Sequence, residues 1–286
     1  MVALVSRADR TAPVMTAWCD ERPCQNTRKE TALTDLTAKE LGDVLAPLME
    51  RLQQHVGGAS TPLTDQLAGA RETLGADRPR EEMDGVHEAQ RQLSALSFDD
   101  AIKVGDRAPR FELPDVHGRP FRLADRLLDG PVVLSFYRGA WCPFCNLELR
   151  ALEARREELE ALGASLVALS PQAPDFSELS ASMNDLHFSV LCDAGNAVAR
   201  RFGIVIEIPE AIRHHQAEQG LDVAHVNADG TREVPTPATY VIDQEGSVRY
   251  AYLNGEYRYR ADPDEVVEAV RAVVTSPNTG STPAVR

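Results

Sequence analysis

The apolar run PVVLSFY, residues 131–137, is followed closely by the cysteine pair of WCPFC and then by leucines at helical spacing. A nearly unbroken apolar run of this length is typical of a strand that is buried on both faces. The leucines that follow predict one long helix over residues 142–162, which ends at Gly163. A second apolar run, residues 164–169, completes a strand–helix–strand unit. Such a unit predicts parallel strands joined by a right-handed crossover, and hence an α/β sheet covered by helices.

Periodicity and apolar content divide the chain into four parts. Residues 1–32 and 276–286 lack periodicity and predict disordered tails. Residues 33–100 predict a helical extension, whose weakly apolar helices can hardly form a core alone. We expect them to pack on the main domain or on a second subunit, so a homodimer would fit. Residues 101–275 form the main α/β domain, in which 204–235 read as an inserted helix and loop.

Composition excludes several classes of function. The net charge of −14 disfavours nucleic-acid partners, because an acidic chain repels phosphate backbones. No apolar stretch approaches the ~18 residues of a membrane span, and the first twenty residues lack a signal peptide's apolar run. We therefore expect a cytoplasmic protein. In that reducing compartment a close cysteine pair is more typical of a catalytic, redox-sensing or metal-binding role than of a structural disulfide.

The cysteine pair lies where a strand gives way to a helix. Cys142 is expected at the helix N-terminus, where unpaired N–H groups and the helix dipole stabilise a thiolate. Cys145 follows three residues later on the same face, so the two thiols can close a small disulfide. Pro143 suits the first helical position. Trp141 is expected as half-exposed packing beside the pair, and Pro237, before the strand ATYVID, can be cis.

Other readings of the cysteines are weaker. A zinc site would need two more ligands of similar quality, and no second CxxC is present in the sequence. We predict no metal and no cofactor. The alternative to a redox role is that the two cysteines are an inert structural pair or half of a metal site. Cys192 ends an apolar strand and is expected in the core. Cys19 and Cys24 are expected to be incidental thiols.

Four segments carry a resemblance to a known family: VGDRAPRFELPDVHGRPFRL, VVLSFYRGAWCPFCNLEL, LCDAGNAVARRFGI and ATYVIDQEGSVRYAY. They resemble the peroxiredoxin-like branch of the alkyl hydroperoxide reductase and thiol-specific antioxidant family, in the thioredoxin superfamily. The similarity covers roughly residues 100–275. It implies a thioredoxin-like fold, a central mixed sheet flanked by helices, to which this chain adds its N-terminal helical extension. It also implies a thiol peroxidase that reduces hydrogen peroxide or organic hydroperoxides and is recycled by thioredoxin or a similar dithiol.

The sequence departs from the family's pattern at the site. Arg138 stands where the family has a proline, Cys142 where it has a threonine, and Cys145 aligns with the peroxide-attacking cysteine. The arginine that the family places before the late strand is replaced by Pro235-Thr236-Pro237, and Arg138 could supply the missing charge. WCxxC followed by a proline loop is also the arrangement of thiol–disulfide exchange. A thioredoxin-like thiol–disulfide oxidoreductase without peroxidase activity, and a redox-sensing or binding module, are therefore the alternatives.

The two lines of argument nominate different attacking thiols. The resemblance nominates Cys145 for peroxide. Physical position nominates Cys142, which is expected to be nearer the free N–H groups and more exposed. For disulfide exchange we predict attack by Cys142. For peroxide the resemblance tips the expectation slightly toward Cys145.

Overall fold

The computed structural model describes residues 36–56, 61–76 and 80–275. The two predicted tails, with Cys19 and Cys24, lie outside the described residues.

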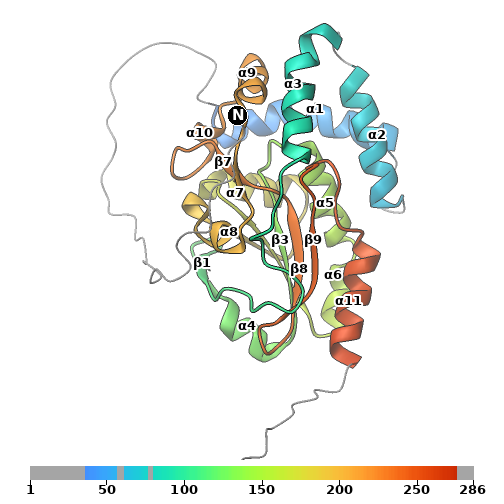
Figure 1. Cartoon of the computed structure of the whole chain (residues 1–286), viewed down its shortest axis with the longest axis vertical. Helices are drawn as coiled ribbons and strands as arrows, with labels where there is room; N and C mark the ends of the chain where they lie inside the picture. Colours follow the sequence, from blue (N-terminus) through green and yellow to red (C-terminus); the bar gives the residue numbers. More distant parts are fainter. Residues whose placement is uncertain (1–35, 57–60, 77–79, 276–286) are drawn as a thin grey trace, which may run out of the picture.

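A five-stranded mixed sheet forms the centre of the protein (Figure 1). Its strand order is β5-β4-β3-β8-β9; β3, β4 and β5 run parallel, and β8 and β9 add antiparallel pairs. The bounds are β3 (Val132–Phe136), β4 (Ser165–Ser170), β5 (Ser189–Cys192), β8 (Ala238–Ile242) and β9 (Val248–Leu253). Every residue of β3 and β8 is buried, as expected for strands covered on both faces.

Helices cover both faces of this sheet. On one face Leu134 and Phe136 of β3 share a core with Phe202, and α4 and α8 close it. On the other face Val133 packs with Leu152 and with α6 and α11. The helices are α4 (Leu123–Asp129), α5 (Pro143–Glu153), α6 (Arg156–Ala161), α7 (Pro174–Met183), α8 (Ala197–Phe202) and α11 (Pro263–Thr275), with a 3₁₀ turn at Ala194–Asn196. This arrangement confirms the predicted α/β class with a central mixed sheet.

The prediction of one helix over 142–162 is wrong. The helix stops at Glu153 and a second begins at Arg156. Arg155 precedes the second helix with non-helical backbone angles (φ −105°, ψ 0°) and pairs with Glu158 of its first turn. The break lets α6 pack on β4 and keeps Leu159 in the core beneath the sheet.

The insertion at 204–235 is more ordered than a helix and a loop. Its ends pair as the antiparallel strands β6 (Val205–Glu207) and β7 (Glu233–Pro235), and α9 (Glu210–Glu218) and α10 (Val223–Val226) lie between them. A further two-stranded sheet joins β1 (Glu112–Pro114) to β2 (Pro120–Arg122).

Three helices precede this domain: α1 (Ala38–Val56), α2 (Leu63–Ala76) and α3 (Arg80–Ser94). They pack on the main domain, α1 against α7, α2 against α5 and α3 against α9 (Figure 1). Their buried Leu52 and Leu67 belong to the same apolar cluster as Tyr137 and Leu149. The helical extension therefore covers the end of the sheet from which α5 starts. Among the described helices, none has the length and apolar character that a membrane span requires.

Candidate active site

The cysteine pair stands at the beginning of α5. Cys142 is the N-cap residue, with extended backbone angles, and Pro143 is the first helical residue. The carbonyl of Cys142 accepts the N–H of Cys145 at 3.0 Å and that of Asn146 at 3.1 Å. The structure thus places Cys142 beside the unpaired N–H groups of the helix and Cys145 one turn further in. Both are free thiols.

Buried polar groups fix the loop that precedes the pair. The N–H of Ala140 donates to Gln172 Oε1 at 2.8 Å, and Asn146 Nδ2 donates to the carbonyl of Ala140 at 2.7 Å. Gly139 has φ +153°, and a Cβ there would lie 2.4 Å from Nε1 of Trp141. Only glycine fits at this position, because both the backbone angle and the indole exclude a side chain.

The expected exposure of the site is wrong. Cys142 is 1% exposed, Cys145 0% and Trp141 6%, because the helical extension covers the beginning of α5. The two thiols still differ in access. Cys142 borders a cavity of about 450 Å³ between the extension and the main domain, whereas Cys145 is not among the described residues that line it.

Arg138 supplies a buried positive charge next to the pair. Its guanidinium lies between the rings of Trp141, at 4.6 Å, and Tyr257, at 4.1 Å. Within the described part of the chain no carboxylate pairs with it, and its buried Nε has no hydrogen-bond partner. The backbone N–H of Arg138 donates to Sγ of Cys145 at 3.5 Å. The charge of Arg138 favours the ionised form of both thiols, and its backbone N–H also contacts Cys145.

A second buried arginine, Arg260, was not predicted from the sequence. Arg260 Nη2 lies 3.3 Å from Sγ of Cys145, and Arg260 Nε donates to Glu148 at 2.6 Å. The side chains of Arg260 and Glu148 are each 1% exposed. Thr239 Oγ1 donates to the other oxygen of Glu148 at 3.3 Å. Arg260 thus supplies a second guanidinium beside the cysteine pair.

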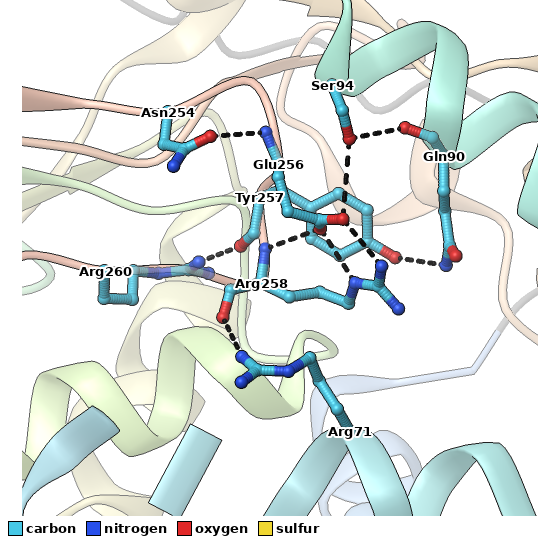
Figure 2. Close-up of polar contacts among 8 residues, drawn as sticks. All are labelled: Arg71, Gln90, Ser94, Asn254, Glu256, Tyr257, Arg258 and Arg260. Atoms are coloured by element: carbon cyan, nitrogen blue, oxygen red, sulfur yellow. Dashed lines mark hydrogen bonds and ion pairs between the residues drawn. The ribbon is translucent and has the colours of Figure 1, made fainter. Parts of the chain in front are cut away.

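The helical extension holds the segment that carries Arg260, residues 254–260. Figure 2 shows Arg71 of α2 donating to the carbonyl of Arg258, at 3.3 Å, and Gln90 of α3 donating to the hydroxyl of Tyr257, at 3.0 Å. Ser94 donates to Glu256 at 3.4 Å. Arg260 in turn donates to the carbonyl of Tyr257. We call residues 254–260 the arginine loop.

The buried charges give the two thiols different pKa values. Burial opposes ionisation of Cys142, but the hydrogen bond from Cys145 and the charges of Arg138 and Arg260 outweigh it and lower the pKa of Cys142 to about 5. Burial, together with the neighbouring Cys142, raises the pKa of Cys145. Burial also raises the pKa of Glu148 to about 7, although Arg260 opposes the shift. The arrangement therefore favours one thiolate, on Cys142, with Cys145 as a thiol beside it.

Pro237 occupies the same end of the sheet, because the next residue, Ala238, pairs with Phe136 of β3. The peptide bond before Pro237, for which the sequence allowed a cis form, is trans, since the described residues contain no cis peptide. The Thr236 N–H donates to the carbonyl of Ile204 at 2.7 Å, which ties the residue before Pro237 to the chain next to β6. Cys192 is buried in β5. In the described ranges no group of three His, Cys, Asp or Glu side chains is arranged to hold a metal ion.

Comparison with known proteins places this site in a family. The sequence model of the AhpC/TSA family matches residues 104–251. The chain belongs to the AhpC/TSA family. A protein of Mycobacterium tuberculosis (strain H37Rv) that bears a peroxiredoxin name is 37% identical over 172 residues, which cover 60% of this chain and 98% of that protein. Chloroplastic peroxiredoxin Q of Sedum lineare is 26% identical over 60% of this chain and 80% of its own length.

Among solved structures, peroxidoxin BcpB of Mycobacterium tuberculosis matches with a TM-score of 0.47 and 27% identity, over 60% of this chain and 98% of its own. The family match confirms the predicted family, and with it the predicted class of enzyme, a thiol-dependent peroxidase. The matched segment, 104–251, includes the cysteine pair and Arg138. It excludes Tyr257, Arg260 and the helical extension.

Proposed function

We propose that Cys142 is the thiolate that attacks peroxide in this enzyme, and that Cys145 resolves the product. The observation that carries the proposal is the access of Cys142 to the cavity, which Cys145 lacks. Its position at the N-terminus of α5 and the charge of Arg138 support the thiolate form. This assignment differs from the one that the family's sequence pattern suggests.

The first step consumes the peroxide. The Cys142 thiolate attacks one oxygen of ROOH, the O–O bond breaks, and the leaving alkoxide takes a proton to become ROH. Cys142 is oxidised to a sulfenic acid and the peroxide is reduced. The guanidinium of Arg138, which has an unpartnered Nε, is placed to stabilise the negative oxygen as it forms.

The second step closes the disulfide. Cys145 attacks the sulfenic sulfur, a Cys142–Cys145 bond forms, and water leaves with the hydroxyl of the sulfenic acid and the proton of Cys145. Arg260 and the Arg138 N–H both point at Sγ of Cys145, so they stabilise the thiolate that this attack requires. Thioredoxin or a similar dithiol then reduces the disulfide by exchange. The cytoplasm is the proposed compartment, because it maintains such dithiols, and a homodimer stays a prediction.

The test uses Cys142→Ser and Cys145→Ser proteins. Each is mixed with hydrogen peroxide, then with a sulfenic-acid trap, and the adduct is located by peptide mass spectrometry. We expect the trap on Cys142 in the Cys145→Ser protein and no adduct in residues 139–150 of the Cys142→Ser protein. An adduct only on Cys145 would reverse the roles.

The same proteins test the alternative of disulfide exchange without peroxide reduction. Peroxide consumption and reduction of a small disulfide are followed in parallel, with dithiothreitol as the reductant. The proposed function requires that peroxide consumption disappears in the Cys142→Ser protein. If the unaltered protein consumes no peroxide but reduces the disulfide, the enzyme is a thiol–disulfide oxidoreductase.

A further inference from the structure

The cavity that ends at Cys142 has walls that the family match does not include. Its outer wall consists of apolar side chains of the extension, among them Leu41, Leu45 and Leu48 of α1 and Val86 of α3. The inner wall includes Trp141 and Phe144 beside the thiol. A volume of about 450 Å³ is within the range of pockets that hold a small organic molecule. We call this space the chamber.

The chamber has an inner end and an outer end. Trp141 and Cys142 are buried at the inner end, whereas Val44, Arg51 and Gly75 line it and are exposed. Val44 is 55% exposed, so an apolar side chain lies at the rim of the chamber. A chain-like molecule that enters past this rim would reach the thiol with one end.

The charge of the lining has one sign. Four arginines (Arg51, Arg71, Arg138 and Arg258) line the chamber, and no Asp or Glu is among its described lining residues. This contrasts with the net charge of −14 of the whole chain. Arg258 is paired with Glu256, but the buried Arg138 has no carboxylate partner in the described part of the protein. A cationic lining without carboxylates complements an anion.

We propose that the chamber is the binding site for a long-chain, carboxylate-bearing organic hydroperoxide of the fatty-acid type. Its apolar chain lies between α1, α2 and α3, its hydroperoxide reaches Cys142 beside Arg138, and its carboxylate meets the arginines of the lining. The helical extension is then the specificity-determining part of the enzyme. The proposal rests on the proposed function only for the reaction, because binding itself requires no chemistry.

Binding is tested first, on the full chain, with oleate as an unreactive probe. A Trp18→Phe background leaves Trp141 as the only tryptophan, so its fluorescence reports occupancy at the inner end. We expect saturable quenching by oleate and weaker binding of the uncharged alcohol of equal length. Absence of a saturable change, or equal binding of the alcohol, would overturn the proposed ligand class.

Two pairs of variants locate the ligand. A Cβ added at Gly75 meets no atom within 4 Å, so Gly75→Phe introduces a large ring at an open position of the lining, and Gly75→Ser is its matched control. Leu48→Glu adds a negative charge to the wall, and Leu48→Gln adds the same volume without charge. We expect Gly75→Phe to weaken oleate binding by about tenfold. Leu48→Glu should weaken oleate binding more than Leu48→Gln does, with no such difference for the alcohol.

Kinetics complete the test. The ratio of kcat/KM for a fatty-acid hydroperoxide to that for hydrogen peroxide should fall about tenfold in Gly75→Phe relative to Gly75→Ser. An unchanged ratio would overturn the chamber as the substrate site. If the variants change oleate binding but the protein reduces no peroxide, the binding site is supported. The proposed function is then contradicted.

Discussion

Nη2 of Arg260 lies 3.3 Å from Sγ of Cys145, although 115 positions separate the two residues in the sequence. The same guanidinium pairs with the buried carboxylate of Glu148. The arginine loop that presents Arg260 is hydrogen-bonded to α2 and α3. The helical extension therefore acts on the cysteine pair in two ways, by covering it and by holding the loop behind it.

The buried pair of Arg260 and Glu148 predicts a strongly asymmetric response to mutation. Arg260→Gln removes the positive charge that pairs with the buried Glu148 and leaves it only the hydroxyl of Thr239, so it should lower the free energy of unfolding by about 3–5 kcal/mol. Replacing both residues, Arg260→Met with Glu148→Leu, removes both buried charges. It should recover most of the free energy of unfolding that the single variant loses. Urea unfolding measures both. Arg91→Gln, at an exposed ion pair, is the control and should cost at most about 1 kcal/mol; equal losses in the single and double variants would refute the prediction.

The reactivity of Cys142 should follow its lowered pKa. A thiolate with a pKa of about 5 is lost only as the pH falls through that value, so alkylation should be nearly independent of pH above neutrality. Arg138→Met removes a charge that lowers this pKa and should move the midpoint upward. The rate of iodoacetamide alkylation, mapped by mass spectrometry between pH 4 and 9, gives both midpoints. A midpoint near the ordinary cysteine value of about 8.5 in the unaltered protein would contradict the prediction.

Tyr257 contacts the helical extension through its hydroxyl and Arg138 through its ring, and two substitutions separate these contacts. Tyr257→Phe loses the hydrogen bond from Gln90 but keeps the ring 4.1 Å from the guanidinium of Arg138. It should lower the free energy of unfolding by about 0.5–1.5 kcal/mol and leave the alkylation midpoint of Cys142 in place. Tyr257→Leu removes the ring and should raise the midpoint, because Arg138 is held less firmly. The same midpoint in both variants would show that the ring does not position the arginine.

Gly139 is predicted to be irreplaceable in the loop before the pair. An added Cβ would lie 2.4 Å from Nε1 of Trp141, at a φ of +153° that L-residues rarely adopt. Gly139→Ala should therefore lower the free energy of unfolding by about 1–3 kcal/mol and lower the melting temperature. Gly75→Ala, where an added Cβ meets no atom within 4 Å, is the control and should be neutral or slightly stabilising. Equal melting temperatures for the two variants would count against the prediction.

The sheet and the place of the cysteine pair can be predicted from sequence because their signals are local. A continuous apolar run marks β3, and the strand-to-helix junction fixes Cys142 at the N-terminus of α5. Glu148 also carries a local signal: it lies three residues after Cys145, between two leucines, where a charged residue needs a buried partner.

The rest of the site depends on contacts between distant segments. The arginine loop has no periodicity, and nothing in its sequence connects Arg260 with a cysteine 115 positions earlier. The burial of Trp141 and Cys142 results from helices more than forty residues upstream, so it contradicts the exposure expected from a helix N-terminus alone.

The helical extension and the main domain share one hydrophobic core. Leu52 and Leu67 contribute to the same apolar cluster as Tyr137, Leu149 and Phe144. The segment that carries the family's pattern, residues 104–251, would therefore expose part of its interior if the extension were removed. The segment that matches the family and the segment that shares one hydrophobic core therefore differ in length, so loss of the extension would be a loss of structure and not a trimming of an accessory.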